Sequence, residues 1–532
     1  IAEYKELLDS EDFGKLSERD YVLWEIDFAD VFMSKGGFDI IIGNPPFVRQ
    51  KNIGPPIIVD HPTTAKERKY YREKLISSAQ TYIGKQLQID KNSDLYVYFY
   101  YLGMSLLNKN GVFVFITSNS WLDVGYGAGL QEWLLNNMEV VDIYDNQAKR
   151  AFKSADINTV IVVFNKPSGN PLTHTARFTA FKKPLEDVVS SDTFIAIEAA
   201  KGIVSTDDFR VYQIAQQELL EEGFEKDKKQ KELKKTVPLA GKYKGNKWGG
   251  KYLRAPDIYF RIMEKVGDKL VRLGDIAEVR RGFTTGCNQF FYFDDAKIKE
   301  WEIEEEFLKP VIKSPRECKT IIIDPIVLPN KLFMCHKTKK ELKNTNALEY
   351  IKWGESQGFH KRPSTRSRPR WWDLVKRKEP EIIIPCSYGE IFKVFLNSGV
   401  FIDKRLYECY IKQPMIMAAL LNCSLTFFFA EIGSRTGLGE GLLDLTVYEV
   451  SDWLVVNPKI VSESKAIEIE EAFEKISRRN IQPVAQEAKN QNRNLLDELI
   501  LQSIDLDKPE IQEIYYELNR MVSNRLDRAN TF

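Results

Sequence analysis

The chain has 532 residues, with 76 Lys and Arg against 76 Asp and Glu, and 43% of its residues are hydrophobic. This length predicts about three to four domains, each with its own core, and the apolar content excludes a disordered chain. No apolar run reaches the roughly 18 residues of a membrane span, since the longest, residues 415–430, is interrupted by Asn422, Ser424 and Thr426.

The first part of the chain, residues 1–165, alternates strand-like and helical segments. Strands are predicted at residues 38–43, 111–117, 140–144 and 159–164, and helices at residues 94–107 and 130–135. Near-continuous apolar strands that alternate with helices are typical of a parallel sheet covered on both faces. We therefore predict the carboxyl-terminal part of a Rossmann-like, doubly wound α/β domain.

The rest of the chain divides into three further regions. Residues 166–250, which are mixed in pattern and lysine-rich towards their end, are predicted to form a connecting region. Short β-rich runs between Gly, Pro and charged turns predict an α+β, mostly β unit over residues 251–455. Apolar positions spaced for one helix face predict a helical carboxyl-terminal region over residues 456–532.

One strand end carries the most informative motif of the sequence. The predicted strand 38–43 runs directly into Asn44-Pro45-Pro46-Phe47. Two consecutive prolines cannot continue a central strand, because proline lacks an amide donor and has a fixed φ angle. The chain must therefore leave the sheet at its carboxyl edge, where open α/β sheets bind their ligands.

This stiff corner offers two acceptors, the Pro45 carbonyl and the Asn44 side-chain oxygen. Two fixed acceptors that face one point match an exocyclic amino group, and the Phe47 ring offers a surface for stacking. An amine held in this way frees a lone pair that can attack an electrophilic methyl group without a strong base. The alternative is an ordinary strand-ending Pro-Pro turn with no chemical role.

The tetrapeptide 44–47 matches the D/N/S-P-P-Y/F/W motif of amino-methyltransferases in its N6-adenine form. The wider chain resembles the methyltransferase part and the target-recognition domain of type IIG restriction–modification enzymes, with the motif order of the gamma class. The similar segments cover nearly the whole chain and are residues 37–50, 94–100, 110–121, 151–164, 253–256, 280–287, 435–441, 496–499 and 515–528.

The resemblance implies a phage-defence enzyme that methylates adenine N6 in double-stranded DNA at a specific sequence, with S-adenosylmethionine as the methyl donor. Asn44 and Pro45 would hold the amine of a flipped adenine, and Phe47 would stack on it. Flipping costs a few kcal/mol, and stacking returns roughly 1–3 kcal/mol per base.

Three further site residues follow from the same resemblance. Phe152 would contact the base from another side, and Phe99 and Pro46 would border the cofactor. For Phe152 and Phe99 the alternative is a place among the core aromatics beside the sheet.

A basic loop supplies the expected DNA contacts of the recognition domain. Residues 361–378 hold eight basic residues and one acidic residue, with two tryptophans among them, which suits phosphate contact combined with stacking. Each arginine could equally pair with a structural carboxylate. The expected DNA-binding residues are Arg280, Arg281, Arg368, Arg370 and Trp371.

The cofactor loop of this family, an aromatic-x-Gly-x-Gly after the first strand, is not found among the 43 residues before Asn44. Asp27 is the only candidate there for the acidic partner of the cofactor ribose. Gly125-Tyr-Gly-Ala-Gly129, followed by Asp142 and Asp145, is similar to a cofactor fingerprint. The strand before it ends too early for a tight turn, so we do not assign cofactor binding there.

The chain begins with Ile1 rather than Met, and the first strands of the sheet are not found in it. We therefore expect that upstream residues of the same protein, or a partner chain, cover strand 38–43. An uncovered strand edge with apolar surface would promote aggregation. No convincing nuclease motif of the P-D…(D/E)-x-K type is present, so DNA cleavage is not assigned.

Two other functions stay open at this point. The chain could be a DNA-recognition fragment that does not methylate by itself, and tight S-adenosylmethionine binding would argue against this. Methylation of RNA or of a protein glutamine through the same loop is less favoured, because such enzymes need no long β-rich recognition domain. Six cysteines without paired spacing and four histidines favour a reducing cytoplasm, with no assigned metal and no membrane partner.

Overall fold

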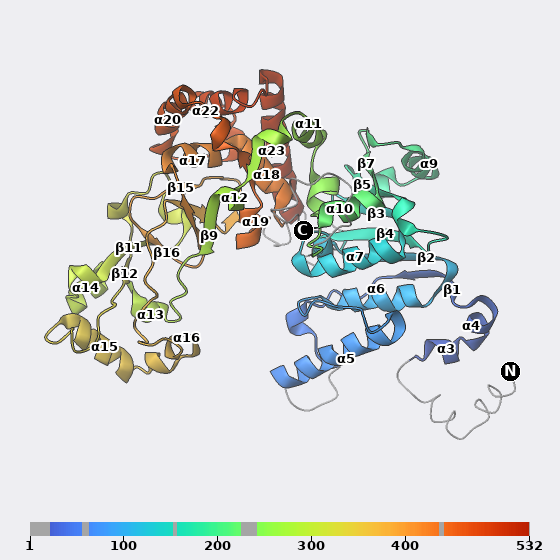
Figure 1. Ribbon diagram of the computed structural model, residues 1–532, viewed down its shortest axis with the longest axis horizontal. Helices are drawn as coiled ribbons and strands as arrows, with labels where there is room; N and C mark the ends of the chain where they lie inside the picture. Colours follow the sequence, from blue (N-terminus) through green and yellow to red (C-terminus); the bar gives the residue numbers. More distant parts are fainter. Residues whose placement is uncertain are drawn as a thin grey trace. The chain divides into compact units, whose positions relative to one another are not determined.

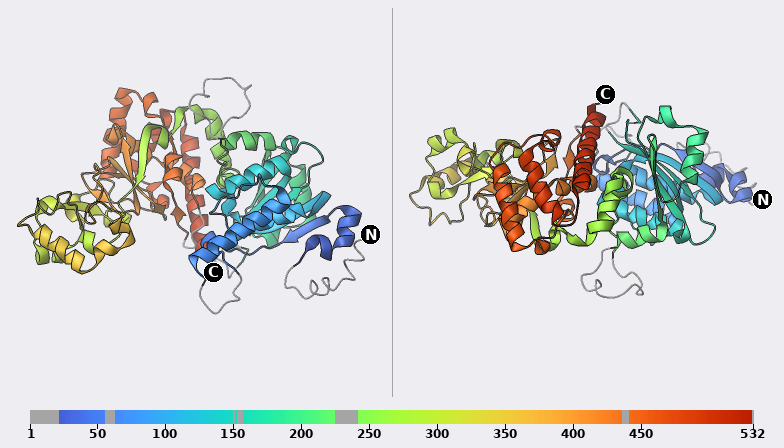
Figure 2. Two further views of the ribbon diagram at one scale, coloured as in Figure 1. Left: turned by 60° about the horizontal axis from the view of Figure 1, so that its bottom comes forward. Right: turned by 90° about the horizontal axis from the view of Figure 1, so that it is seen from above.

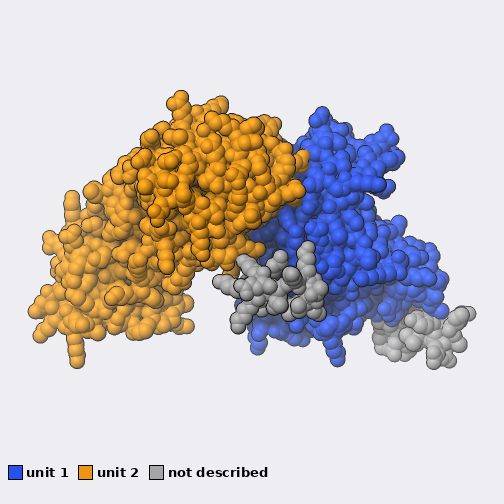
Figure 3. Space-filling model, turned by 45° about the horizontal axis from the view of Figure 1, so that its top comes forward, with its two compact units in different colours: residues 1–151, 158–253 blue, residues 152–157, 254–532 orange. Residues whose placement is uncertain are grey.

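The computed structural model describes residues 22–55, 63–149, 151–152, 157–224, 242–435 and 441–530. Two compact units are distinguished in the chain, and Figure 3 colours them separately. The first comprises residues 1–151 and 158–253, and the second comprises residues 152–157 and 254–532.

A seven-stranded mixed sheet in the order β1-β2-β4-β3-β5-β7-β6 forms the centre of the first unit (Figure 1). The pairs β1–β2 and β3–β5 are parallel, whereas β4 is antiparallel to both β2 and β3. The strands are β1 (Phe38–Gly43), β2 (Leu107–Ser118), β3 (Glu139–Asn146), β4 (Thr159–Asn165), β5 (Thr175–Phe181), β6 (Ile203–Ser205) and β7 (Phe209–Ala215). The predicted α/β fold is confirmed, but the sheet is mixed rather than parallel, because β3 and β4 are sequential neighbours that pair as in a hairpin.

Residues expected to form a connecting region extend this sheet. The three strands β5, β6 and β7 all lie within residues 166–250, and β5 pairs with β3 over residues 142–146. Residues 225–241 of the expected connecting region lie outside the described residues. The first unit runs on to residue 253.

Helices cover the sheet of the first unit on both faces. The main core lies under α6 (Leu95–Ser105), α7 (Ala128–Asn137) and α10 (Gln216–Gly223), and α5 (Ala65–Ile83) lies along α6 (Figure 1). A smaller core on the opposite face packs under α8 (Leu185–Val188) and α9 (Ser191–Ala199). Two short helices, α3 (Trp24–Asp27) and α4 (Ala29–Lys35), precede β1. The start of α5 is a capping box, in which Thr64 and Glu67 satisfy each other's backbone amides.

Strand β1 forms one edge of the sheet. Its Ile41 faces the main core, and its other face carries Ile40 and Ile42, which are 64% and 78% exposed. Their partners on β2, Val112 and Val114, are only half-buried. The edge with apolar surface that the sequence analysis expected at residues 38–43 is therefore present.

The second unit combines two four-stranded sheets and the two-stranded sheets β14-β18 and β19-β8 with a set of helices. The strand orders are β15-β13-β17-β9 and β10-β12-β11-β16. The strands are β8 (Leu270–Arg272), β9 (Ala277–Arg281), β10 (Tyr292–Phe293), β11 (Leu308–Ile312), β12 (Lys331–Phe333), β13 (Ile382–Pro385), β14 (Ser387–Tyr388), β15 (Phe395–Leu396), β16 (Phe401–Ile402), β17 (Leu406–Ile411), β18 (Leu443–Asp444) and β19 (Leu454–Val456). Its helices up to residue 451 are α11 (Asp257–Val266), α12 (Leu273–Ile276), α13 (Asn288–Phe291), α14 (Asp295–Trp301), α15 (Asn346–Ser356), α16 (Pro363–Arg366), α17 (Pro414–Leu421), α18 (Ser424–Gly433) and α19 (Val447–Ser451).

The carboxyl-terminal region is helical, as predicted. It consists of α20 (Glu463–Ser477), α21 (Val484–Glu487), α22 (Gln491–Gln502) and α23 (Lys508–Asn530), and α20 and α22 lie side by side (Figures 1 and 2). These helices share one hydrophobic core with α11, α17, α18 and the β13–β17 strand pair. The helical region is therefore built onto the β-rich region rather than set apart from it.

Buried polar contacts fasten this region to α18. Arg525 Nε lies 2.7 Å from Glu431 Oε1, and both side chains are almost fully buried. Asp497 accepts hydrogen bonds from the Ser424 amide and hydroxyl and from the Tyr515 hydroxyl. Because a buried charge without its partner is strongly destabilising, these contacts specify how the tail docks.

Within the described ranges, no single helix is long and apolar enough to cross a membrane. The helices α17 and α18 reach such a length only when they are counted together across a 61° bend. Both are packed in the core of the second unit.

Candidate active site

The Asn44–Phe47 corner, defined as Asn44, Pro45, Pro46 and Phe47, lies directly after β1 at the carboxyl edge of the sheet. Gly43, the last residue of β1, pairs with Phe115 of β2, and a Cβ atom at Gly43 would lie 2.8 Å from the Phe115 ring. Asn44 and Pro46 are exposed, Pro45 is buried and Phe47 is half-buried. The corner thus has a buried base and an exposed carboxamide.

Backbone hydrogen bonds dock the chain after the corner onto α6. The Val48 amide donates to the Pro46 carbonyl over 2.9 Å, which closes a three-residue turn. The Val48 carbonyl then accepts from the Leu95 amide over 3.0 Å, and the Gln50 amide donates to an Asp94 carboxylate oxygen over 2.8 Å. The corner is therefore held between the end of β1 and the start of α6.

The two other predicted aromatic residues lie in different units. Phe99 is on α6 and is 37% exposed, whereas Tyr98 and Tyr100 beside it are buried, so Phe99 is not a fully packed core aromatic. Phe152 is half-buried and belongs to the second unit. The structure thus places Pro46 and Phe99 in one unit, and the contacts predicted for them stay predictions.

The glycine-rich segment 125–129 has a structural explanation. Residues Gly125–Gly127 form a 3-10 turn before α7, and a Cβ atom at Gly127 would lie 1.9 Å from the Trp121 carbonyl oxygen. The hydroxyl of Tyr126 donates to Asp94 over 3.0 Å and lies 2.7 Å from the Tyr96 hydroxyl. The segment therefore packs against the start of α6.

The acidic residues considered for the cofactor have other partners. Asp142 is fully buried and accepts hydrogen bonds from Arg177 Nε and from the Thr179 hydroxyl, both over 2.9 Å. Burial raises the pKa of Asp142 to about 6, although the bonds from Arg177 and Thr179 act against this rise. Asp27 is exposed, and its carboxylate accepts from the Leu23 amide over 2.8 Å.

Two of the predicted DNA-binding arginines, Arg280 and Arg281, are exposed on β9 of the second unit. Arg280 forms an ion pair with Glu278 over 2.6 Å, and its guanidinium carbon lies 5.5 Å from the centre of the Tyr410 ring. The Nε atom of Arg281 donates to the Lys404 carbonyl over 3.0 Å. Their contact with DNA stays a prediction.

The segment 368–371 is packed rather than free. Trp371 is 7% exposed, its indole N–H donates to Glu355 over 3.0 Å, and its ring centre lies 4.5 Å from that of Phe290. A side chain in this position has no free face for a base. The stacking role expected for Trp371 is therefore corrected to a core role, because an aromatic-rich cluster around Phe290 and Tyr350 takes up the ring.

The two arginines beside Trp371 also have structural partners. One Nη atom of Arg368 donates to the carbonyls of Thr284 and Thr285 over 2.9 and 2.8 Å. Arg370 pairs with Asp373 through both Nε and Nη2. Both arginines therefore have the structural partners that the sequence analysis left open as an alternative to DNA contact.

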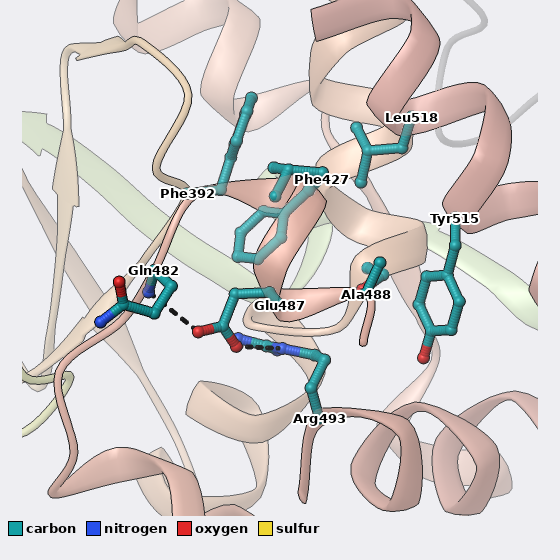
Figure 4. Close-up of a pocket in the computed structure, with 10 residues that line it drawn as sticks. Phe392, Phe427, Gln482, Glu487, Ala488, Arg493, Tyr515 and Leu518 are labelled. Carbon is teal, nitrogen blue, oxygen red and sulfur yellow. Dashed lines mark hydrogen bonds and ion pairs between the residues drawn. The ribbon is translucent and has the colours of Figure 1, made fainter. Parts of the chain in front are cut away.

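A pocket in the second unit is drawn in Figure 4. In it, Glu487 accepts from the Gln482 amide over 2.9 Å and pairs with Arg493 and Arg479 over 3.3 and 2.7 Å. These charges satisfy one another, so we assign the cluster to tail docking. Among the residues that the structure describes, no three His, Cys, Asp or Glu side chains gather as potential metal ligands.

Sequence reasoning did not identify Asp94 and Tyr126 as site residues. Asp94 begins a segment that is similar to a known family, and Tyr126 lies within a glycine-rich motif. One signal was present, because Asp before an apolar helical run is a typical N-cap. That signal predicts a helix start and does not predict a contact with the corner.

Two family models match the chain. Residues 2–152 match the Eco57I restriction-modification methylase family, and residues 245–493 match the C-terminal domain of the type II methyltransferase M.Eco57I. The type II methyltransferase M.AccI of Acinetobacter calcoaceticus is 22% identical over 73% of this chain and 62% of that protein. M.BstVI of Geobacillus stearothermophilus, also a type II methyltransferase, is 27% identical over 26% of this chain and 20% of that protein.

A solved structure supports the fold. The type IIL restriction-modification enzyme MmeI in complex with DNA matches 95% of this chain and 56% of that chain, with a TM-score of 0.50 and 14% identity. The chain thus spans less than two thirds of each of these relatives. The resemblance to restriction–modification methyltransferases is confirmed by the two family models, each of which matches less than half of the chain.

Proposed function

We propose that the protein is a sequence-specific DNA adenine-N6 methyltransferase that flips its target base and acts within a type IIG restriction–modification system. The observation that carries this proposal is the exposed Asn44 carboxamide in a proline-stiffened corner at the carboxyl edge of the sheet. The match of residues 2–152 to a methylase family model supports methyl transfer, and the corner supports an amine as the acceptor.

The corner would act on the amine through two oxygens. The Asn44 side-chain oxygen and the Pro45 carbonyl would each accept one N–H of adenine N6, which draws the nitrogen lone pair out of the ring. The buried position of Pro45 keeps its carbonyl from turning, so the amine is oriented before reaction. The half-buried ring of Phe47 would stack on the flipped base, and Phe152 would contact it from another side.

S-adenosylmethionine would supply an electrophilic methyl group when bound. Exposed Pro46 and Phe99 fit a role beside it, since both present apolar surface to solvent in the first unit. Asp27 and Asp142 do not fit the role of the ribose-binding acid. The Asp27 carboxylate accepts a hydrogen bond from the Leu23 amide, and Asp142 is fully buried.

The second unit would read the DNA. Among the residues proposed for this role, Arg280 and Arg281 are exposed and suit phosphate or base contact, whereas Arg368, Arg370 and Trp371 are no longer proposed. Binding of double-stranded DNA should therefore weaken steeply as salt is raised.

We also propose that another part of the protein, or a partner chain, covers β1. Support comes from the edge position of β1 and from the exposed Ile40 and Ile42. In this case the chain described here would bind DNA without methylating it alone. Isothermal titration of S-adenosylmethionine into this chain and into the full-length protein distinguishes the two cases, because tight binding by this chain alone would show that the cofactor site is complete.

Sequencing with modified-base detection tests the methylation. DNA is taken from cells that express the full gene, the Asn44→Ala variant or no gene. We expect N6-methyladenine in one sequence context with the wild-type gene only. Equal modification with Asn44→Ala would contradict the role of Asn44, and the absence of modified adenine with both genes would contradict DNA adenine methylation.

A further inference from the structure

We propose that Asp94 is a positioning residue that holds the Asn44–Phe47 corner in its reactive shape, and that Tyr126 fixes Asp94 in turn. The proposal rests on the methyltransferase function proposed above. Neither side chain is placed in contact with substrate, so both would act through the backbone of the corner.

The first step is the attachment of the corner at both of its ends. Its amino end follows Gly43, whose place is set by pairing with β2. Its carboxyl end is bound at Val48 and Gln50 to the first residues of α6, Leu95 and Asp94. Only four residues lie between these anchors, and two of them are prolines, so a shift of the α6 anchor must move Asn44.

The second step is that the Asp94 side chain does not cap the helix that it precedes. Asp94 is the N-cap residue of α6, yet its side chain accepts no hydrogen bond from the α6 backbone. One carboxylate oxygen accepts from the Gln50 amide over 2.8 Å, and the other accepts from the Tyr126 hydroxyl over 3.0 Å. An ordinary N-cap would instead bond the amide two or three residues later. The carboxylate is therefore used to join distant segments.

The third step is the fixing of Tyr126. The Tyr126 hydroxyl donates its hydrogen bond to Asp94. The Tyr96 hydroxyl, 2.7 Å away, therefore donates to the oxygen of the Tyr126 hydroxyl. Tyr96 is 1% exposed and offers a rigid anchor. Gly127 allows the close approach of this turn to the Trp121 carbonyl. Burial and the charge of Asp94 raise the pKa of Tyr126 far above its usual value, which keeps it a donor.

The surroundings of the Asp94 carboxylate also affect its pKa. Burial raises the pKa of Asp94, while the bonds from Gln50 and Tyr126 and the charge of Arg49 act against this rise. A carboxylate that accepts two hydrogen bonds in a partly buried place is expensive to remove, since its donors are then left without a partner. Loss of the side chain should therefore loosen the loop at residues 48–50.

The test compares Asp94→Ala, Asp94→Asn and Tyr126→Phe in the full-length protein. Amide hydrogen exchange of Asn44 and of residues 47–52 reports the loop without any need for activity. We expect about tenfold faster exchange at Gln50 in Asp94→Ala, the effect of losing one hydrogen bond to a charged acceptor. Asn offers an oxygen to the same amide, so Asp94→Asn should stay within about threefold of wild type. Tyr126→Phe should fall between these two variants.

Methylation kinetics give the second readout. In Asp94→Ala we expect kcat to fall about tenfold with little change in the KM for DNA, and Asp94→Asn should restore most of the lost kcat. A merely structural role would lower the amount of active protein in both variants alike and would not separate kcat from KM. Asp90→Ala is the matched control, since Asp90 is exposed and its carboxylate accepts a hydrogen bond from the nearby Asn92 amide rather than from the loop at residues 48–50.

The outcomes are separable. Unchanged exchange at Gln50 in Asp94→Ala, or equal exchange in the Ala and Asn variants, overturns the positioning role of Asp94. A wild-type protein that does not methylate DNA contradicts the proposed function. In that case the exchange rate at Gln50 still tests whether Asp94 holds the loop at residues 48–50. If Asp94→Ala does not fold, Tyr126→Phe decides, because exchange equal to wild type in that variant overturns the role of Tyr126.

Discussion

The Asn44–Phe47 corner and the segment 368–371 carry similar side chains, an aromatic ring beside polar groups and proline, but they have opposite environments. Asn44 and Pro46 are exposed at the end of a strand. Trp371 is buried in an aromatic cluster, and Arg368 is bonded to two backbone carbonyls. A proline-restricted strand end is a local property that sequence shows, whereas the exposure of an Arg-Trp loop depends on distant residues that fold over it.

The aromatic cluster explains why the second segment turned inward. Phe290, Tyr350 and Trp371 come from three segments well apart in sequence, and their rings pack with centres 4.5–4.6 Å apart around Phe290. Burial of large aromatic rings contributes more than a stacking surface kept open for DNA. An Arg-rich composition therefore predicts a nucleic-acid contact only when the aromatic residues have no core to join.

The largest expected effect that separates the two regions is on stability. Trp371→Ala should lower the free energy of unfolding by about 3–5 kcal/mol, because it leaves a cavity in the aromatic cluster and removes one hydrogen-bond donor from Glu355, which keeps its ion pair with Lys339. Denaturant unfolding measures this, with Val375→Ala as the control, since Val375 is 71% exposed. A Trp371→Ala variant of normal stability with weakened DNA binding would restore the original stacking role.

A smaller loss of stability is expected at Arg368. Arg368→Ala removes the donor for the Thr284 and Thr285 carbonyls and should cost about 2–3 kcal/mol. Exposed Arg366 offers the control substitution Arg366→Ala, for which unfolding should change by less than about 0.5 kcal/mol. If the two variants were equally stable and Arg368→Ala bound DNA much more weakly, Arg368 would be a DNA contact after all.

In the corner the effect should appear in activity instead. Phe47→Ala should lower kcat/KM for DNA methylation by about tenfold to a hundredfold, from the loss of base stacking. Phe47→Tyr keeps the ring and should stay near wild type. Steady-state methylation of duplex DNA measures both, and equal losses in the two variants would argue against stacking.

The smallest effect concerns Arg280, one of the two exposed arginines of β9. Arg280→Ala should leave stability within about 0.5 kcal/mol, since its pair with Glu278 is exposed, and should reduce the salt slope of DNA binding by about 1. Arg272 is similarly exposed and pairs with Asp452, so Arg272→Ala serves as the control. An unchanged salt slope in Arg280→Ala would remove this residue from the DNA interface.

Much of the architecture could be predicted from hydrophobic periodicity and from the glycines and prolines that end helices and strands. Strand 38–43, the proline corner and the order of β-rich and helical regions follow from local patterns. Local patterns do not predict the direction of β4 or the strands within residues 166–250, because strand pairing is decided by neighbours that are far apart in sequence. The Asp94–Gln50 and Asp94–Tyr126 contacts join segments 44 and 32 residues apart. Local sequence patterns therefore cannot predict these contacts, which hold the corner in place.

The rate of a single methyl transfer by the full-length protein tests the role of Asn44 most directly. Wild type and Asn44→Ala are mixed with saturating S-adenosylmethionine and a duplex that carries the recognised sequence. Because Asn44 is exposed, Asn44→Ala should fold with normal stability and transfer the methyl group at least about a hundredfold more slowly. A folded Asn44→Ala protein that transfers the methyl group at the wild-type rate would contradict the assignment of the corner as the catalytic site.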